Sequence, residues 1–346
     1  MSGFDLGGRR MISKPRRAIG MSDVSRYTLF AVLAAIGCTA PAASVQNSTE
    51  VGPPTIEVEP VRTTASLPRD ADDPAIWINR ADPSHSLILG TMKVGSPEGS
   101  LAVFGLDGTL HELLRGPDRP NNVDVEYGLT LKGTPTDIAV VTERQGRRLR
   151  VYAIPADGGS LRDVSSGQMP ILEGAQGAQG GPMGIGLYRR PKDGAIFAIV
   201  SPKAGPKNNY LWQYRLSDDG SGQVKATFVR RFGSFSGKGE IEAVVVDDEL
   251  GYVYYADEQV GIHKWHADPD APGADQELAL FGTAGYQSDR EGLGIYALSN
   301  GTGYIVSVDQ LRGESVFHVY RREGEPGRPH DHSKEVMTFR GHADST

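Results

Sequence analysis

Cysteine is nearly absent from this sequence, since Cys38 is the only one among 346 residues. No intramolecular disulfide can therefore form, and zinc sites built on several cysteines are excluded. Long hydrophobic runs are missing too. The apolar run at residues 27–38 has twelve residues, which is too short to cross a membrane as a helix. We therefore expect no membrane span.

An excess of positive charge is also lacking. Lys and Arg number 36 against 43 Asp and Glu, which gives a net charge of −7. This balance argues against non-specific nucleic-acid binding, and we expect no nucleic-acid partner. No Ser/His/Asp grouping, phosphate-binding loop or dinucleotide fingerprint appears. The eight histidines are scattered, so we interpret none of them as a metal ligand.

The N-terminal segment has the three parts of a secretory signal. Residues 9–17 are basic, residues 27–38 are apolar, and small residues follow. We predict that residues 1–45 comprise a signal peptide and a preceding basic segment, with Met11 or Met21 as alternative starts. The protein is then exported to the periplasm or the extracellular space.

Two further predictions concern the chain that follows the signal. Residues 35–38 resemble a weak lipoprotein cleavage box, so lipid anchoring through Cys38 stays open beside simple removal of that residue. Residues 46–55 are polar and rich in turn formers, which predicts a linker. Residues 56–346 then form one domain, which we expect to be monomeric.

Turn formers are plentiful, with 44 Gly and 22 Pro. Among them, an apolar strand that carries an aromatic ring and runs into a turn recurs five times, at intervals of 48 to 62 residues. The aligned rings are Phe104, Tyr152, Tyr214, Trp265 and Tyr320. Several strands per unit, at a period near fifty, are typical of propeller blades. Counting further strand material from residue 56 onward and at the C-terminus, we predict an all-β, six-bladed β-propeller, with a two-sheet sandwich as the alternative.

Acidic motifs fall at the edges of the predicted strands. They occupy residues 70–73, 121–124, 240–242, 257–258 and 289–291. Each motif alone is ordinarily a turn or a solvated strand edge. Residues i and i+2 share a face of a strand, so Asp289 and Glu291 can point together. Carboxylates that converge on one channel need a cation, and oxygen ligands without a Cys or His cluster select calcium or magnesium.

Taken together, these motifs resemble those of the β-propeller phytases, a calcium-dependent bacterial family. The motifs run in family order over nearly all of the mature chain. They are DADDPAIW (70–77), NNVDVEYG (121–128), TER (142–144), IEAVVVDDE (241–249), YYADE (254–258) and DREGLGIY (289–296). The resemblance implies a 3-phytase, a phosphoric monoester hydrolase. It would release phosphate from the calcium complex of phytate (myo-inositol hexakisphosphate) by attack of a metal-activated water.

The resemblance also implies roles for single residues, with several calcium ions as cofactor. The implied metal ligands are Glu57, Asp72, Glu242, Glu258, Asp289, Glu291 and Gln310. The implied catalytic residues are Lys93, Arg144, Lys203 and Glu242. The implied substrate-binding residues are Lys93, Arg144, Lys203, Asn122 and Asp124.

The sequence departs from the family pattern at two places. Glu126 stands where the family often has an arginine, and the chain ends at Thr346 before a segment that the family carries. We therefore expect the last blade to be incomplete. Two alternatives to a working phytase follow, a truncated inactive fragment and a calcium-stabilised propeller that binds a partner without turnover. A lactonase- or esterase-type calcium propeller has less support, because it needs a histidine acid or base at the channel.

Overall fold

The structure, a computed structural model, describes residues 54–342. The chain divides into two units, residues 1–50 and 51–346, and the described residues belong to the second. The predicted signal peptide, the anchor at Cys38, most of the linker and the last four residues lie outside the described residues. Within the described part, no helix has the length and apolar character needed to cross a membrane.

The described part of the chain forms five sheets. Strands β2 to β5 are Ala71–Trp77, Leu87–Met92, Ser100–Gly105 and Leu110–Arg115; β6 to β9 are Pro120–Leu131, Thr134–Glu143, Arg148–Ile154 and Arg162–Asp163; β10 to β13 are Pro182–Arg189, Ile196–Pro202, Asn208–Asp218 and Val224–Ser234. Strands β14 to β17 are Val244–Asp247, Tyr252–Asp257, Gly261–His266 and Ala279–Phe281; β18 to β21 are Asp289–Ala297, Gly303–Leu311, Glu314–Arg321 and Glu335–Gly341; β1 is Thr55–Val58. Three short 3₁₀ turns, η1 to η3, are Pro83–His85, Gly177–Gly180 and Ser299–Gly301.

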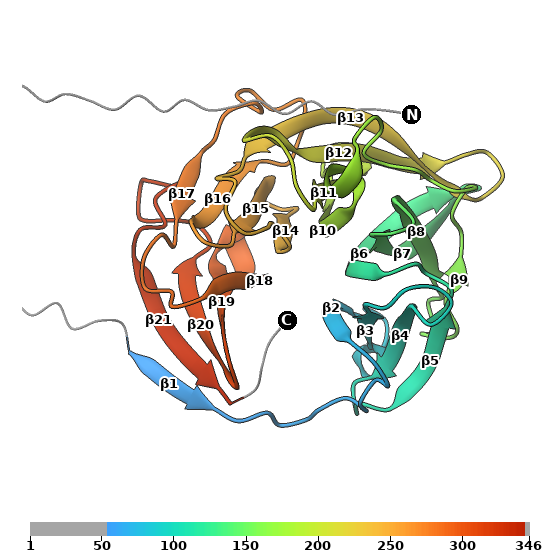
Figure 1. The fold of residues 1–346 in the computed structure, drawn as a ribbon, viewed down its shortest axis with the longest axis horizontal. Coiled ribbons are helices and arrows are strands. Elements are labelled where there is room, and N and C mark those ends of the chain that lie inside the picture. The colour runs from blue at the N-terminus through green and yellow to red at the C-terminus, as the bar shows by residue number, and fades with distance from the viewer. Residues whose placement is uncertain (1–53, 343–346) are drawn as a thin grey trace, which may run out of the picture. The chain divides into compact units, whose positions relative to one another are not determined.

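The sheets follow one another around a common centre, with the first strand of each sheet innermost (Figure 1). We number the sheets 1 to 5 in chain order, so their first strands are β2, β6, β10, β14 and β18. From β2 to β21, strands that follow one another within a sheet pair antiparallel. This arrangement is a β-propeller, so the all-β prediction is confirmed.

The aromatic repeat marks the same place in every sheet. The five rings lie on the third strands, β4, β8, β12, β16 and β20, and none is more than 6% exposed. Apolar side chains fill the space between each pair of neighbouring sheets, from sheets 1 and 2 through to sheets 4 and 5. Burial of one such side chain contributes about 1.5–3 kcal/mol, so packing between sheets fixes where the first strands lie.

The predicted count of six blades is wrong for residues 54–342, which form five sheets. The count treated the strand material near residue 56 as part of an extra blade. Instead β1 pairs parallel with β21, from Thr55 opposite Thr338 to Val58 opposite Gly341. Sheet 5 therefore has four antiparallel strands and one added strand, and within the described residues it is not shorter than the other sheets.

Candidate active site

The predicted basic residues occupy one repeated position, at the end of the second strand of sheets 1 to 3. The amide of Lys93 donates to the carbonyl of Asp70 at 2.7 Å, and that of Lys203 donates to Gly181 at 2.7 Å. In sheet 2 the amide of Arg144 donates to the carbonyl of Arg119 at 3.0 Å. These bonds hold the end of each second strand beside the start of its first strand. We call this end of the central channel the channel mouth.

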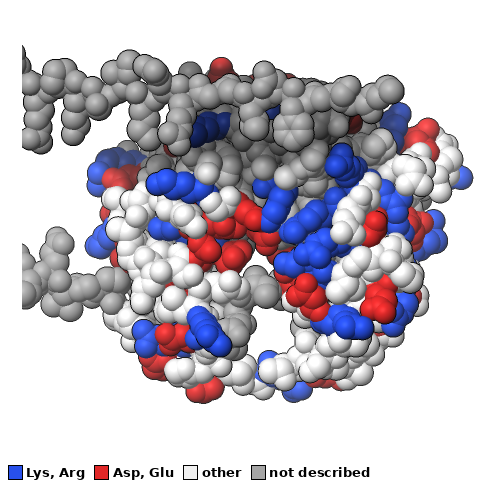
Figure 2. All heavy atoms as spheres, in the orientation of Figure 1, with Lys and Arg blue, Asp and Glu red and all other residues white. Residues whose placement is uncertain are grey.

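Carboxylate and amide groups occupy the same position in sheets 4 and 5. The amide of Glu258 donates to the carbonyl of Glu240 at 3.3 Å, and Gln310 lies opposite Asp289 in the register of β18 and β19. The channel mouth is thus divided, with cations on sheets 1 to 3 and mostly oxygen donors on sheets 4 and 5. Figure 2 shows carboxylates in the middle of one face beside a band of Lys and Arg.

Three ion pairs lie at the channel mouth, and two of them link its cationic half to its acidic half. Lys93 pairs with Asp72, and Lys203 pairs with Glu240. Arg144 pairs with Glu242, with its guanidinium 3.2 Å from Oε1. These carboxylates and cations are only partly accessible, so their attraction is stronger than in bulk water. Among these residues, only Glu240 had no role implied by the family resemblance. Its position two residues before Glu242 could have predicted it, because residues i and i+2 of a strand share a face.

Further carboxylates crowd the acidic half. Burial, and next the negative charge of Glu291, raise the pKa of Glu258 to about 8. Burial, and next the charge of Glu242, raise the pKa of Glu291 to about 7. Asp289 lies close enough to raise both pKa values. The three carboxylates come from two different sheets, so the structure brings together predicted ligands that are 31 to 33 residues apart in the sequence.

The pair Asn122 and Asp124 lies deeper, on β6. The side-chain amide of Asn122 donates to the carbonyl of Glu242 at 3.5 Å, which puts it at the edge of the mouth. The carboxylate of Asp124 instead accepts backbone N–H groups from Val125 and Leu187, both at 2.7 Å. Oδ2 ties β6 to β10 through Leu187, whereas Oδ1 accepts from Val125 within β6 itself. In this structure the contacts of Asp124 are therefore structural.

Glu57 lies apart from the other predicted ligands. It is on β1, the outermost strand of sheet 5, and its side chain is 57% exposed. Its carboxylate pairs with Arg340 at 3.7 Å and with His342 at 3.6 Å. The structure thus brings together Asp72, Glu242, Glu258, Asp289, Glu291 and Gln310, but not Glu57.

The donor set of the mouth fits calcium. It is made of carboxylate and amide oxygens with no sulfur or imidazole ligand, and its acidic members outnumber Lys93, Arg144 and Lys203. Within residues 54–342, no group of three or more His, Cys, Asp and Glu side chains already forms a metal site. Several of the carboxylates are held by lysine or arginine instead. Metal binding therefore requires them to exchange these partners.

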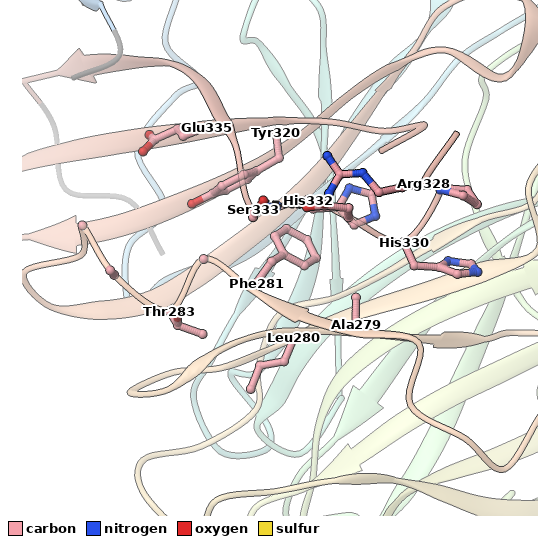
Figure 3. Close-up of a pocket in the computed structure, with 15 residues that line it drawn as sticks. Ala279, Leu280, Phe281, Thr283, Tyr320, Arg328, His330, His332, Ser333 and Glu335 are labelled. Carbon is pink, nitrogen blue, oxygen red and sulfur yellow. Dashed lines mark hydrogen bonds and ion pairs between the residues drawn. The ribbon is translucent and has the colours of Figure 1, made fainter. Parts of the chain in front are cut away.

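The channel behind the mouth is a cavity of about 450 Å³, lined by residues from the first strands of all five sheets. A larger hollow of about 810 Å³ lies elsewhere, between β17 and the loop before β21 (Figure 3). Its buried His332 uses both ring nitrogens internally, Nδ1 with the carbonyl of Arg321 at 2.8 Å and Nε2 with Lys264 at 3.0 Å. That hollow offers no free acid or base on His332, so we place the candidate site at the channel mouth.

Comparison with known proteins identifies relatives of this chain. A 3-phytase of Bacillus subtilis (strain 168) is 35% identical over 272 residues, which cover 78% of this chain and 65% of the relative. Among solved structures, the computationally designed Ika8 protein matches with a TM-score of 0.39 and 16% identity, covering 80% of this chain and 63% of that one. The model of the family described as Phytase matches residues 21–335. The chain therefore belongs to the Phytase family.

Proposed function

We propose that this chain hydrolyses phosphate monoesters of phytate in a calcium-dependent reaction of the 3-phytase type. The observation that carries the proposal is the divided channel mouth, in which Lys93, Arg144 and Lys203 lie beside carboxylates of sheets 4 and 5. A cationic half suits the phosphate groups of a polyanion, and an oxygen-rich half suits Ca²⁺. Membership of the Phytase family and similarity to a 3-phytase support the same activity.

Several calcium ions belong to the proposal. The oxygens of Asp72, Glu242, Glu258, Asp289, Glu291 and Gln310 would hold them at the mouth. Glu57, on the outer strand, would serve only a separate site. When bound, calcium supplies positive charge that polarises a phosphate group and makes water a better nucleophile.

The chain's own cations would bind and orient the substrate. Lys93 and Lys203 each hold a carboxylate that a phosphate oxygen can replace without loss of a charge-assisted hydrogen bond. Arg144 has a planar guanidinium that can contact two oxygens of one phosphate. The positive charge of these three residues would stabilise the negative charge that builds up on the phosphoryl oxygens in the transition state, which lowers the barrier.

Two residues near the mouth complete the proposed site. Glu242 is paired through Oε1 with Arg144, and its other oxygen, Oε2, is the proposed acceptor of a proton from the attacking water. Asn122 would help to set the edge of the substrate site through the backbone of Glu242. Asp124 would act at a distance, by holding β6 against β10.

The setting of the enzyme is also part of the proposal. The basic, apolar and small-residue segments at the N-terminus support export to the periplasm or the extracellular space, with a soluble or a lipid-anchored mature protein. We propose that the protein works as a monomer on the calcium complex of phytate.

The test is phosphate release from phytate by the full chain, with added calcium and then with excess chelator. We expect calcium-dependent release, and Lys93→Ala should raise KM for phytate by about tenfold, because a charge-assisted hydrogen bond is lost. Lys334→Ala, an exposed lysine before β21, is the control and should leave KM unchanged. A folded protein that binds calcium and releases no phosphate would show a binding module and contradict the proposed activity.

A further inference from the structure

Arg290 breaks a pattern that the other four sheets share. It is the second residue of β18 and lies opposite Asp309 on β19. In sheets 1 to 3 the same register position holds Ala71, Pro120 and Pro182, opposite Met92, Glu143 and Pro202. In sheet 4 it holds Ile241, the residue after Glu240. Four sheets thus have an apolar residue where sheet 5 has an arginine that is only 5% exposed.

The contacts of Arg290 run from sheet 5 to sheet 4. Its terminal nitrogen Nη1 donates to the carbonyl of Glu258 at 2.7 Å, and its own backbone N–H donates to the same carbonyl at 3.3 Å. Its Nε donates to the carbonyl of Gly282 at 2.8 Å. The ring of Tyr286 lies 4.0 Å from the centre of the guanidinium. The side chain is therefore held in one orientation by three groups.

No carboxylate among residues 54–342 forms an ion pair with Arg290 within 4 Å. The charges of the buried Asp309 and Asp257 stabilise the guanidinium from a distance, but burial still lowers the pKa of Arg290. Burial of a guanidinium without a direct ion pair is costly, and an apolar residue suffices at this position in the other sheets. The arginine is thus poorly explained by packing alone. Its neighbours are Asp289 and Glu291, and it holds the main chain of Glu258.

We propose that Arg290 is a positioning residue of the channel mouth, which locks the backbone of Glu258 to β18 so that the carboxylates of Glu258, Asp289 and Glu291 keep one spacing for calcium. This inference rests on the proposed function, because the calcium site belongs to it. Three ligands on two sheets can move apart when the sheets shift. A two-point tie from a rigid, planar side chain limits that shift where the ligands stand.

Arg290→Lys tests the inference, because lysine keeps the charge and loses the fork that reaches Gly282 and Glu258 together. The matched control is Arg322→Lys. Arg322 is also buried and also joins sheet 5 to sheet 4, through Asp247 at the other end of β14. The measurements are calcium affinity by isothermal titration calorimetry, thermal stability in chelator, and KM and kcat for phytate.

We expect Arg290→Lys to bind calcium about tenfold more weakly, with a matching rise in the calcium needed for half-maximal phosphate release. Arg322→Lys should unfold at a lower temperature and bind calcium as the unchanged protein does. If Arg290→Lys does not fold, Tyr286→Leu should weaken calcium binding in the same direction, because it removes the ring that stacks on the guanidinium. Tyr286→Phe is its control: it keeps that ring and its stacking on His318, loses only the hydroxyl, which contacts Tyr320, and should bind calcium as the unchanged protein does.

Equal calcium affinity in the unchanged protein and in Arg290→Lys, or in Tyr286→Leu if the lysine variant does not fold, would overturn the inference and leave Arg290 a purely structural tie. That result leaves the proposed function intact. An unchanged protein that binds no calcium would instead refute the calcium site itself, and the role of Arg290 with it. Phosphate release from the unchanged protein separates these two failures.

Discussion

The replacement Glu126→Gln should make the protein more stable at neutral and alkaline pH. Glu126 is on β6, is 4% exposed, and lines a pocket of about 570 Å³ at the end of the first strands away from the channel mouth. It faces Asp248, whose carboxylate accepts the backbone N–H of Arg189 at 2.8 Å. Burial, and next the charge of Asp248, raise the pKa of Glu126 well above its ordinary value of 4.5.

The size of the effect follows from the raised pKa. Above pH 4.5 the unfolded chain loses the Glu126 proton while the folded chain keeps it, so the folded state binds more protons. The free energy of unfolding then falls as pH rises, by about 1.4 kcal/mol per pH unit for one proton. Over the two to three units up to pH 7 this amounts to roughly 3 kcal/mol. Glutamine resembles the protonated acid in size, can donate a hydrogen bond toward Asp248, and does not titrate.

The assay is the midpoint of thermal unfolding of Glu126→Gln and of the unchanged protein between pH 4.5 and pH 9. The two curves should meet near pH 4.5 and separate as pH rises, with the variant several degrees higher at pH 8. Glu98→Gln, at a largely exposed glutamate, is the control and should follow the unchanged protein. Parallel curves for Glu126→Gln and the unchanged protein would refute the reasoning, because Glu126 would then titrate alike in both states.

Two further predictions concern buried cations. Arg322→Met should destabilise the fold by about 3–5 kcal/mol, because Asp247 would remain buried without its partner, and a denaturant titration that shows under 1 kcal/mol would contradict this. Burial lowers the pKa of Lys264 to about 7, so between pH 7 and 10.5 the unfolded chain binds more protons and stability rises with pH. Lys264→Met should flatten this rise in unfolding curves between pH 6 and 10, and an unchanged slope would exclude Lys264 as its source.

Local sequence patterns were enough to predict the recurring strands and the types of side chain available at the candidate site. The rings from Phe104 to Tyr320 predicted one strand in every sheet, because apolar periodicity and turn residues act over a few neighbours. The structure shows that this strand is the third of each sheet. The family resemblance pointed to Lys93, Arg144 and Glu258, and all three lie at the channel mouth in the structure. The residue types alone indicated oxygen ligands for a hard cation, whereas the role of the cations in phosphate binding was implied only by the family resemblance.

Only the tertiary structure decided how these parts combine. The pairing of β1 with β21 joins residues that are nearly 300 positions apart, and no local pattern reports such a contact, so the blade count could not be predicted. The same pairing carried Glu57 to the outer edge. The register of the second strands puts Lys93 and Glu258 at equivalent positions of their sheets, which gives the mouth a cationic half and an acidic half. The same register shows that Arg290 stands where the other sheets have an apolar residue. Sequence determines which side chains are available, whereas packing between sheets decides which of them meet, because the energy of burial is shared among residues far apart in the chain.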